Sequence, residues 1–139
     1  MQQSPRKFWE VWGRSDALYN RWAAAHGVNN YRLFVLYVLD NHPGATQKAI
    51  ADHAGLPKQT VNTVVKELER QGYVFFQTGK KEKQVRFTEA GRAFAGPCLQ
   101  ELYEIEDRAV AAMGEARFRE MVEANRAFTE AFAREVQHG

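Results

Sequence analysis

The chain has 139 residues, of which 45% are hydrophobic and 26% charged, and its formal net charge is +2. This size predicts one globular domain, because two independent domains of ordinary size need a longer chain. No apolar run approaches the ~20 residues that span a bilayer, and the N-terminus lacks the apolar core of a signal peptide. With a single cysteine, Cys98, which suggests a reducing compartment, we expect a cytoplasmic protein without membrane association.

Charge is distributed unevenly along the chain. Residues 44–92 carry nine basic and five acidic groups, net +4, whereas residues 93–139 carry five basic and nine acidic groups, net −4. A basic centre beside an acidic C-terminal third predicts one face turned towards phosphates and another kept away from them.

Helices are predicted on both sides of the central segment. Residues 5–26 carry an aromatic stripe, and residues 30–41 are apolar on most sides, which predicts a central place in the core. Two alanine-rich helices with apolar stripes follow residue 92 and are separated by Gly114. Gly96-Pro97 should kink the first of these or break its first turns.

Residues 45–91 predict a winged helix-turn-helix. Thr46 caps a short helix that ends near Gly55, and a second helix follows over residues 57–71. Apolar residues with i, i+3, i+4, i+7 spacing give this second helix a packing face. Its opposite face is polar, with Gln59, Asn62, Thr63, Lys66 and Arg70.

A helix with this polar face suits the major groove of DNA, whose base edges offer donors and acceptors to short polar side chains near the helix N-terminus. The alternative is an ordinary solvated helix face. The candidate base-reading residues are Gln59, Thr60, Asn62 and Thr63, of which Thr60 points more sideways than the others. The candidate phosphate and backbone contacts are Thr46, Gln47, Lys58, Lys66 and Arg70.

A β-hairpin is predicted from residues 73–77 and 84–88, which are rich in β-branched and aromatic side chains. Its polar tip is rich in lysine, which suits contacts to phosphates or the minor groove. The alternative is that these lysines protect an exposed hairpin edge from aggregation. The candidate wing contacts to DNA are Lys80, Lys81, Lys83 and Arg86.

Aromatic side chains of the first two helices could line a pocket for a small aromatic effector, or form core or a dimer interface. These residues are Trp12, Tyr19, Trp22, Tyr31, Phe34 and Tyr37.

The remaining reactive residue types predict no further site. Cys98 could be a redox sensor. The alternative is a buried structural cysteine, because it lies on the apolar stripe of its helix. The four histidines show no metal-ligand spacing, so we expect no metal and no cofactor. No catalytic motif is present in the sequence, and we expect no enzyme activity.

The motifs of the central segment resemble those of the MarR family of bacterial winged-helix transcriptional regulators. The matching stretches are Thr46-Gln47-Lys48-Ala49-Ile50-Ala51, Gly55-Leu56-Pro57-Lys58-Gln59-Thr60-Val61, Leu68-Glu69-Arg70-Gln71-Gly72-Tyr73-Val74 and Phe87-Thr88-Glu89-Ala90-Gly91. The resemblance implies a homodimer held by the terminal helices, a pseudo-palindromic operator, and aromatic or phenolic ligands that reduce DNA affinity.

The wing departs from the family pattern. Family members usually carry Asp-x-Arg, whereas this chain reads Gly79-Lys80-Lys81-Glu82-Lys83. Lysine lacks the planar fork of arginine, so we expect wing contacts to DNA that are more purely electrostatic.

We therefore expect one mainly α (α+β) domain over residues 1–139. Its winged helix-turn-helix spans residues 45–91, with a two-stranded β-hairpin wing, and its N- and C-terminal dimerisation helices span residues 5–43 and 92–137. The expected function is that of a homodimeric repressor that binds double-stranded DNA and is released by a small-molecule effector. The alternative is a winged-helix protein-interaction module without specific DNA binding.

Overall fold

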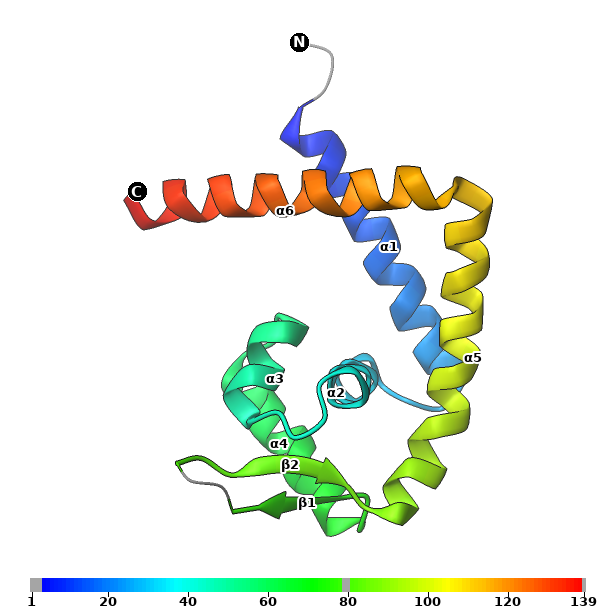
Figure 1. Ribbon diagram of the computed structural model, residues 1–139, viewed down its shortest axis with the longest axis vertical. Helices are drawn as coiled ribbons and strands as arrows, with labels where there is room; N and C mark the ends of the chain where they lie inside the picture. Colours follow the sequence, from blue (N-terminus) through cyan, green and yellow to red (C-terminus); the bar gives the residue numbers. More distant parts are fainter. Residues whose placement is uncertain (1–3, 79–80, 139) are drawn as a thin grey trace. The chain divides into compact units, whose positions relative to one another are not determined.

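Helices dominate this computed structural model, which describes residues 4–78 and 81–138 (Figure 1). The chain divides into two compact units, and the boundary between Cys98 and Leu99 falls within a helix. Within the described residues, no helix is long and apolar enough to cross a membrane. The elements are α1 (Pro5–Ala25), α2 (Asn30–Asn41), α3 (Gln47–Ala54), α4 (Lys58–Arg70), β1 (Val74–Gln77), β2 (Gln84–Phe87), α5 (Glu89–Met113) and α6 (Glu115–His138).

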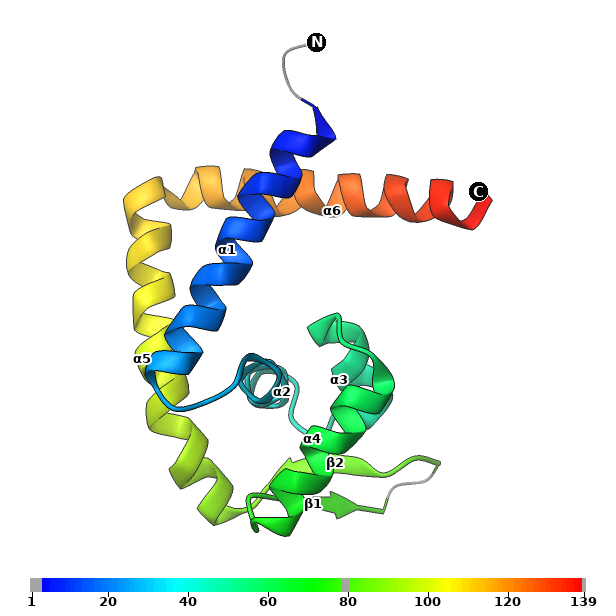
Figure 2. The same ribbon diagram turned by 180° about the vertical axis from the view of Figure 1, so that it is seen from behind.

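α2 is the central helix of the first unit, as its apolar sequence predicted. It contacts α1, α3, α4 and β2, and it is seen end-on between α1 and α3 in both Figure 1 and Figure 2. The side chain of Asn29 caps it by accepting a hydrogen bond from the backbone N–H of Arg32 at 2.8 Å. Its buried side chains are Leu33, Val35, Leu36, Val38 and Leu39.

The predicted helix-turn-helix is formed by α3 and α4. The hydroxyl of Thr46 accepts a hydrogen bond from Ala49 N at 3.1 Å, which caps α3. Gly55 ends α3 at φ +67°, a left-handed conformation that glycine adopts without the steric cost of a Cβ. α4 then buries Val61, Val65 and Leu68, which leaves its polar face available.

The wing is an antiparallel pair in which Val74 lies opposite Phe87 and Gln77 opposite Gln84. The backbone N–H of Val85 donates to Ala45 O at 2.9 Å. This bond ties β2 to the segment that leads into α3, so the wing and the helix-turn-helix form one structural element.

Thr88 and Gly91 connect the start of α5 to the end of the helix-turn-helix. The Thr88 hydroxyl donates to Gly72 O at 2.6 Å and accepts from Gly91 N at 2.9 Å, so it joins the start of α5 to the chain leaving α4. A Cβ on Gly91 would lie 1.8 Å from the carbonyl oxygen of Tyr73. Only glycine permits this close approach of two backbone segments.

The second unit consists of the remainder of α5 and of α6, which meet at Gly114 with φ +100°. α6 has no buried residue within the described part of the chain. Of the two outcomes expected at Gly96-Pro97, a break of the first turns is wrong, because α5 continues through this proline, and a kink stays a prediction. Proline removes one i→i−4 hydrogen bond, and the rest of the 25-residue helix is retained around that loss.

Candidate nucleic-acid interface and ligand cleft

The polar face of α4 presents two of the four predicted base-reading side chains to solvent. Gln59 and Thr63 are exposed, and the Thr63 hydroxyl donates to Gln59 O at 3.0 Å. Thr60 and Asn62 are half-buried, and Asn62 Oδ1 is buried with no hydrogen-bond partner in the described structure. Gln59 and Thr63 are therefore the side chains that can reach a base edge without rearrangement.

The N-terminus of α3 lies in the same helix-turn-helix and carries the predicted contacts Thr46 and Gln47. Both side chains are half-buried, and the Thr46 hydroxyl already serves as the N-cap acceptor while its proton remains able to donate. A helix N-terminus directs free N–H groups and partial positive charge at an anion. This end of α3 thus fits a phosphate even though the Gln47 amide is largely enclosed.

Arg70, a predicted phosphate contact, is already paired. Its guanidinium donates two hydrogen bonds to the carboxylate of Glu67 on the same helix. The hydrogen bonds from Arg70 lower the pKa of Glu67, and the same bonds raise the pKa of Arg70. A phosphate would have to compete with Glu67 for this guanidinium, whereas Lys58 and Lys66 are exposed.

The wing lysines differ from Arg86 in their accessibility. Lys81 and Lys83 are exposed near the hairpin tip, and the predicted contact Lys80 lies outside the described residues. Arg86, the fourth candidate wing contact, is half-buried: it donates to Gln84 Oε1 at 3.0 Å and to Gln77 Oε1, and its guanidinium packs on Gly44. Arg86 therefore braces the hairpin against the loop before α3.

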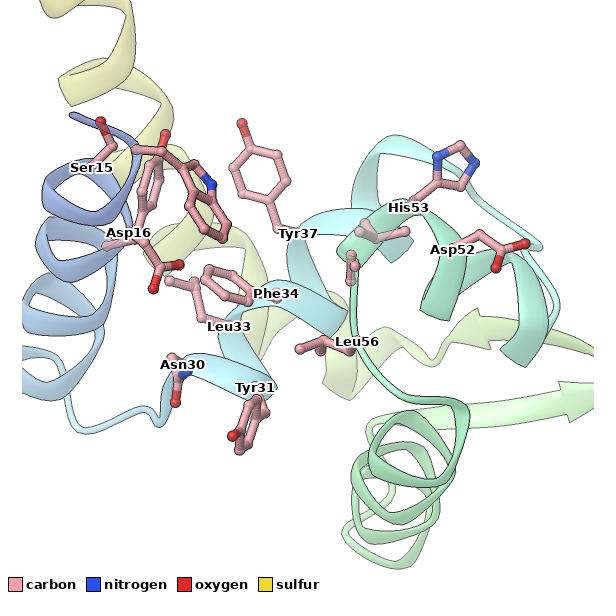
Figure 3. A pocket seen from close by; sticks show the side chains of 15 residues that line it. Ser15, Asp16, Asn30, Tyr31, Leu33, Phe34, Tyr37, Asp52, His53 and Leu56 are labelled. Atoms are coloured by element: carbon pink, nitrogen blue, oxygen red, sulfur yellow. The ribbon is translucent and has the colours of Figure 1, made fainter. Parts of the chain in front are cut away.

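A cleft of about 760 Å³ opens between α1, α2 and the end of α3, all within the first unit (Figure 3). Trp22, the sixth residue predicted for this pocket, lies outside the cleft lining, and its ring stacks on His26 with centroids 3.9 Å apart. The predicted aromatic residues that do line the cleft are Trp12, Tyr19, Tyr31, Phe34 and Tyr37.

Several polar residues of the cleft were missed from the sequence. Asp16 and Asn30 line it, as does His53, whose ring stacks on His42 with centroids 3.9 Å apart. Asp16 follows Trp12 by four residues, so helical spacing alone places both on one face and could have identified it. The pairing of His42 with His53 joins two elements, and no local spacing signals it.

Cys98 is half-buried. Within residues 4–78 and 81–138, no group of three or more His, Cys, Asp or Glu side chains is arranged to hold a metal ion.

The comparisons with known proteins agree with the geometry of the first unit. The model of the MarR family matches residues 26–83, which cover α2, α3, α4 and β1 and end just before β2. The fold is similar to that of NMB1585, a MarR family regulator from Neisseria meningitidis, at 26% sequence identity and a TM-score of 0.88, over 96% of each chain. No curated protein was found to match. Residues 26–83 are thus similar to the MarR family, and the resemblance inferred from the sequence is confirmed.

More distant structures share the fold. One is MepR of S. aureus in complex with DNA, at 17% identity and a TM-score of 0.74, over 94% of this chain and 96% of MepR. Another is BpsR of Bordetella bronchiseptica, whose DNA binding is regulated by 6-hydroxynicotinic acid, at 14% identity and a TM-score of 0.70, over 92% of this chain and 94% of BpsR. The chain thus has the winged-helix fold of MarR-family transcriptional regulators.

Proposed function

We propose that the protein is a homodimeric, sequence-specific DNA-binding repressor that a small molecule releases from a pseudo-palindromic operator. The observation that carries the proposal is the exposed polar face of α4, flanked by the N-terminus of α3 and by the basic wing. Gln59 and Thr63 suit base edges, and Lys58, Lys66, Lys81 and Lys83 suit phosphates. The relative MepR has been solved in complex with DNA, which supports this use of the fold.

Exposed apolar side chains on the terminal helices support the homodimer. On α1, Trp9 is 67% and Leu18 56% exposed, and on α6, Phe132 is 58% and Val136 61% exposed. A soluble monomer rarely leaves so many large apolar groups in water. A second copy of the chain would cover them, and two-fold symmetry would double the number of bases read.

The cleft supports control by an effector. Its lining includes Ala54, Gly55 and Leu56, at the end of α3 and in the turn that leads to α4. A ligand that binds better to an arrangement unsuited to DNA must weaken DNA binding by the same factor. Regulation of BpsR by 6-hydroxynicotinic acid is a precedent in a protein of the same fold.

The salt dependence of duplex binding tests the DNA-binding role. Phosphate contacts release counterions, so the logarithm of affinity should fall steeply with the logarithm of salt concentration. The double variant Lys81→Ala, Lys83→Ala should make this dependence less steep, by about 1 in slope for each phosphate that the wing no longer binds. Arg119→Ala with Arg134→Ala removes the same charge from α6 and should leave the slope unchanged.

Either of two results would contradict the proposal. Weak binding with a flat salt dependence would favour a winged-helix module that recognises a protein. An equal decrease of slope in both double variants would show that net charge, and not the wing, determines DNA affinity.

A further inference from the structure

The cleft between α1, α2 and the end of α3 is lined by acidic as well as aromatic side chains. Its described lining contains Asp16 and Asp52 but no lysine or arginine. The Asp52 carboxylate is paired with Lys48 at 3.3 Å on the surface. Among the described residues, Asp16 forms no ion pair and accepts a hydrogen bond from Asn20 Nδ2 at 3.4 Å. The cleft therefore contains one carboxylate whose charge no lysine or arginine balances.

The end of α3 adds a second source of negative potential. Leu56 lies across the cleft from Asp16, which belongs to α1 (Figure 3), and Ala54 and Gly55 at the end of α3 line the cleft as well. The last carbonyl groups of a helix lack partners within the helix and carry partial negative charge. A cation between α1 and α3 would thus have favourable charge on both sides.

The aromatic side chains of the cleft are compatible with a cation as well. Ring faces attract positive charge through their quadrupole, most strongly where water is displaced. Tyrosine hydroxyl groups both donate and accept hydrogen bonds, so Tyr19 and Tyr37 do not select for ligand charge. An anionic phenol or carboxylate would meet Asp16 and the end of α3 without a lysine or arginine in the described lining.

We propose that this cleft binds an organic cation with an aromatic body, in preference to an anionic aromatic ligand. The proposal rests on the proposed function, in which the cleft is the effector site, and it narrows the aromatic or phenolic ligands that the family resemblance implies. A cavity of about 760 Å³ lies within the range of about 300–1,000 Å³ that is usual for small-molecule sites.

Fluorescence anisotropy with two xanthene dyes tests the charge preference, using the full chain at pH 8 without DNA. Rhodamine 123 is a cation, and fluorescein is an anion with the same ring skeleton. Rhodamine 123 should bind about tenfold more tightly, from the combined cation–π and carboxylate attraction. Asp16→Asn should lower the affinity for rhodamine 123 about three- to fivefold, as expected for one partly exposed charge. The affinity for fluorescein should not fall. Asp107→Asn, which removes an exposed carboxylate outside the cleft, should change neither affinity.

A second variant, Tyr37→Leu, removes one aromatic ring of the cleft wall and so tests whether the dye binds there. It should also lower the affinity for rhodamine 123. Equal or tighter binding of fluorescein would overturn the preference for cations. Failure of both dyes to bind, or rhodamine binding that neither Asp16→Asn nor Tyr37→Leu weakens, would overturn the proposal that the cleft is the site. None of these outcomes bears on DNA binding, because the assay contains no DNA.

Discussion

At the scale of single residues, the structure separates side chains that the sequence treats as equivalent. Gln59 and Asn62 are both polar residues on one face of α4, yet Gln59 is exposed whereas Asn62 Oδ1 is buried without a partner. A buried polar atom without a hydrogen bond carries a desolvation cost. The two residues should therefore respond differently to the same substitution.

Gln59→Ala should relax the preference for one base pair by about 1–3 kcal/mol, the value of a good side-chain contact to a base edge. Non-specific affinity should be nearly unchanged, since no charge is removed. Asn62→Ala should affect base preference less and should not lower the free energy of unfolding, because it removes an unpaired buried group. Competition binding on single-base operator variants and urea unfolding measure these effects. A larger loss of preference in Asn62→Ala would place the reading face elsewhere.

Glu67 is expected to restrain DNA binding through its ion pair with Arg70. Glu67→Gln should free the guanidinium for a phosphate and remove a negative charge from α4, so affinity for all duplexes should rise and the salt slope should steepen by about 1. Glu123→Gln breaks the matched i, i+3 pair with Arg126 on α6 and should have no effect. Unchanged affinity in Glu67→Gln would mean that Arg70 does not approach DNA.

At the scale of secondary-structure elements, the junction between the hairpin and α5 depends on Gly91. Gly91→Ala would place Cβ 1.8 Å from Tyr73 O, so the two backbone segments must separate. We expect a loss of unfolding free energy above about 2 kcal/mol, in the range of overpacked sites. Gly13→Ala replaces another helical glycine, in α1, where a Cβ would meet no other part of the molecule within 4 Å, and it should change stability by less than about 1 kcal/mol. Similar losses in urea unfolding for both variants would contradict this account.

Much of the helix-turn-helix and wing could be predicted from local sequence signals. Thr46 caps α3, Gly55 takes the left-handed turn, and the apolar spacing of α4 identified its buried face. These signals act within a few residues, which is why sequence reasoning recovers them. A break at Pro97 was wrong, because α5 continues through it; a local signal such as proline does not weigh one lost hydrogen bond against the rest of a long helix.

The side chains whose surroundings come from distant segments could not be placed from the sequence. The alternation of side chains along β2 would place Arg86 on the outer face of the hairpin. Its guanidinium instead lies against Gly44, which is remote in sequence. Trp22 shares the aromatic stripe of α1 but stacks on His26 outside the cleft. In each case a tertiary contact decides the outcome, and local periodicity carries no information about it.

At the scale of the whole molecule, the exposed apolar stripe of α6 should be the seam of the homodimer. Phe132→Glu would bury a charge in that seam at a cost of several kcal/mol, so we expect monomers in analytical ultracentrifugation and loss of specific DNA binding. Ala127→Glu introduces the same residue about 140° around α6 from Phe132, by the 100° step of a helix, outside the apolar stripe, and should leave the dimer intact. Dimers that persist in Phe132→Glu would place the interface elsewhere.

The most direct test of the central claim is selection of bound duplexes from a random pool, followed by titration of the selected sequence at several salt concentrations. A dimeric operator reader predicts an enriched pseudo-palindrome whose half-sites lie about one helical turn apart, bound tightly and with a steep salt dependence. A pool that shows no enrichment, with weak binding throughout, would contradict sequence-specific DNA recognition by this protein.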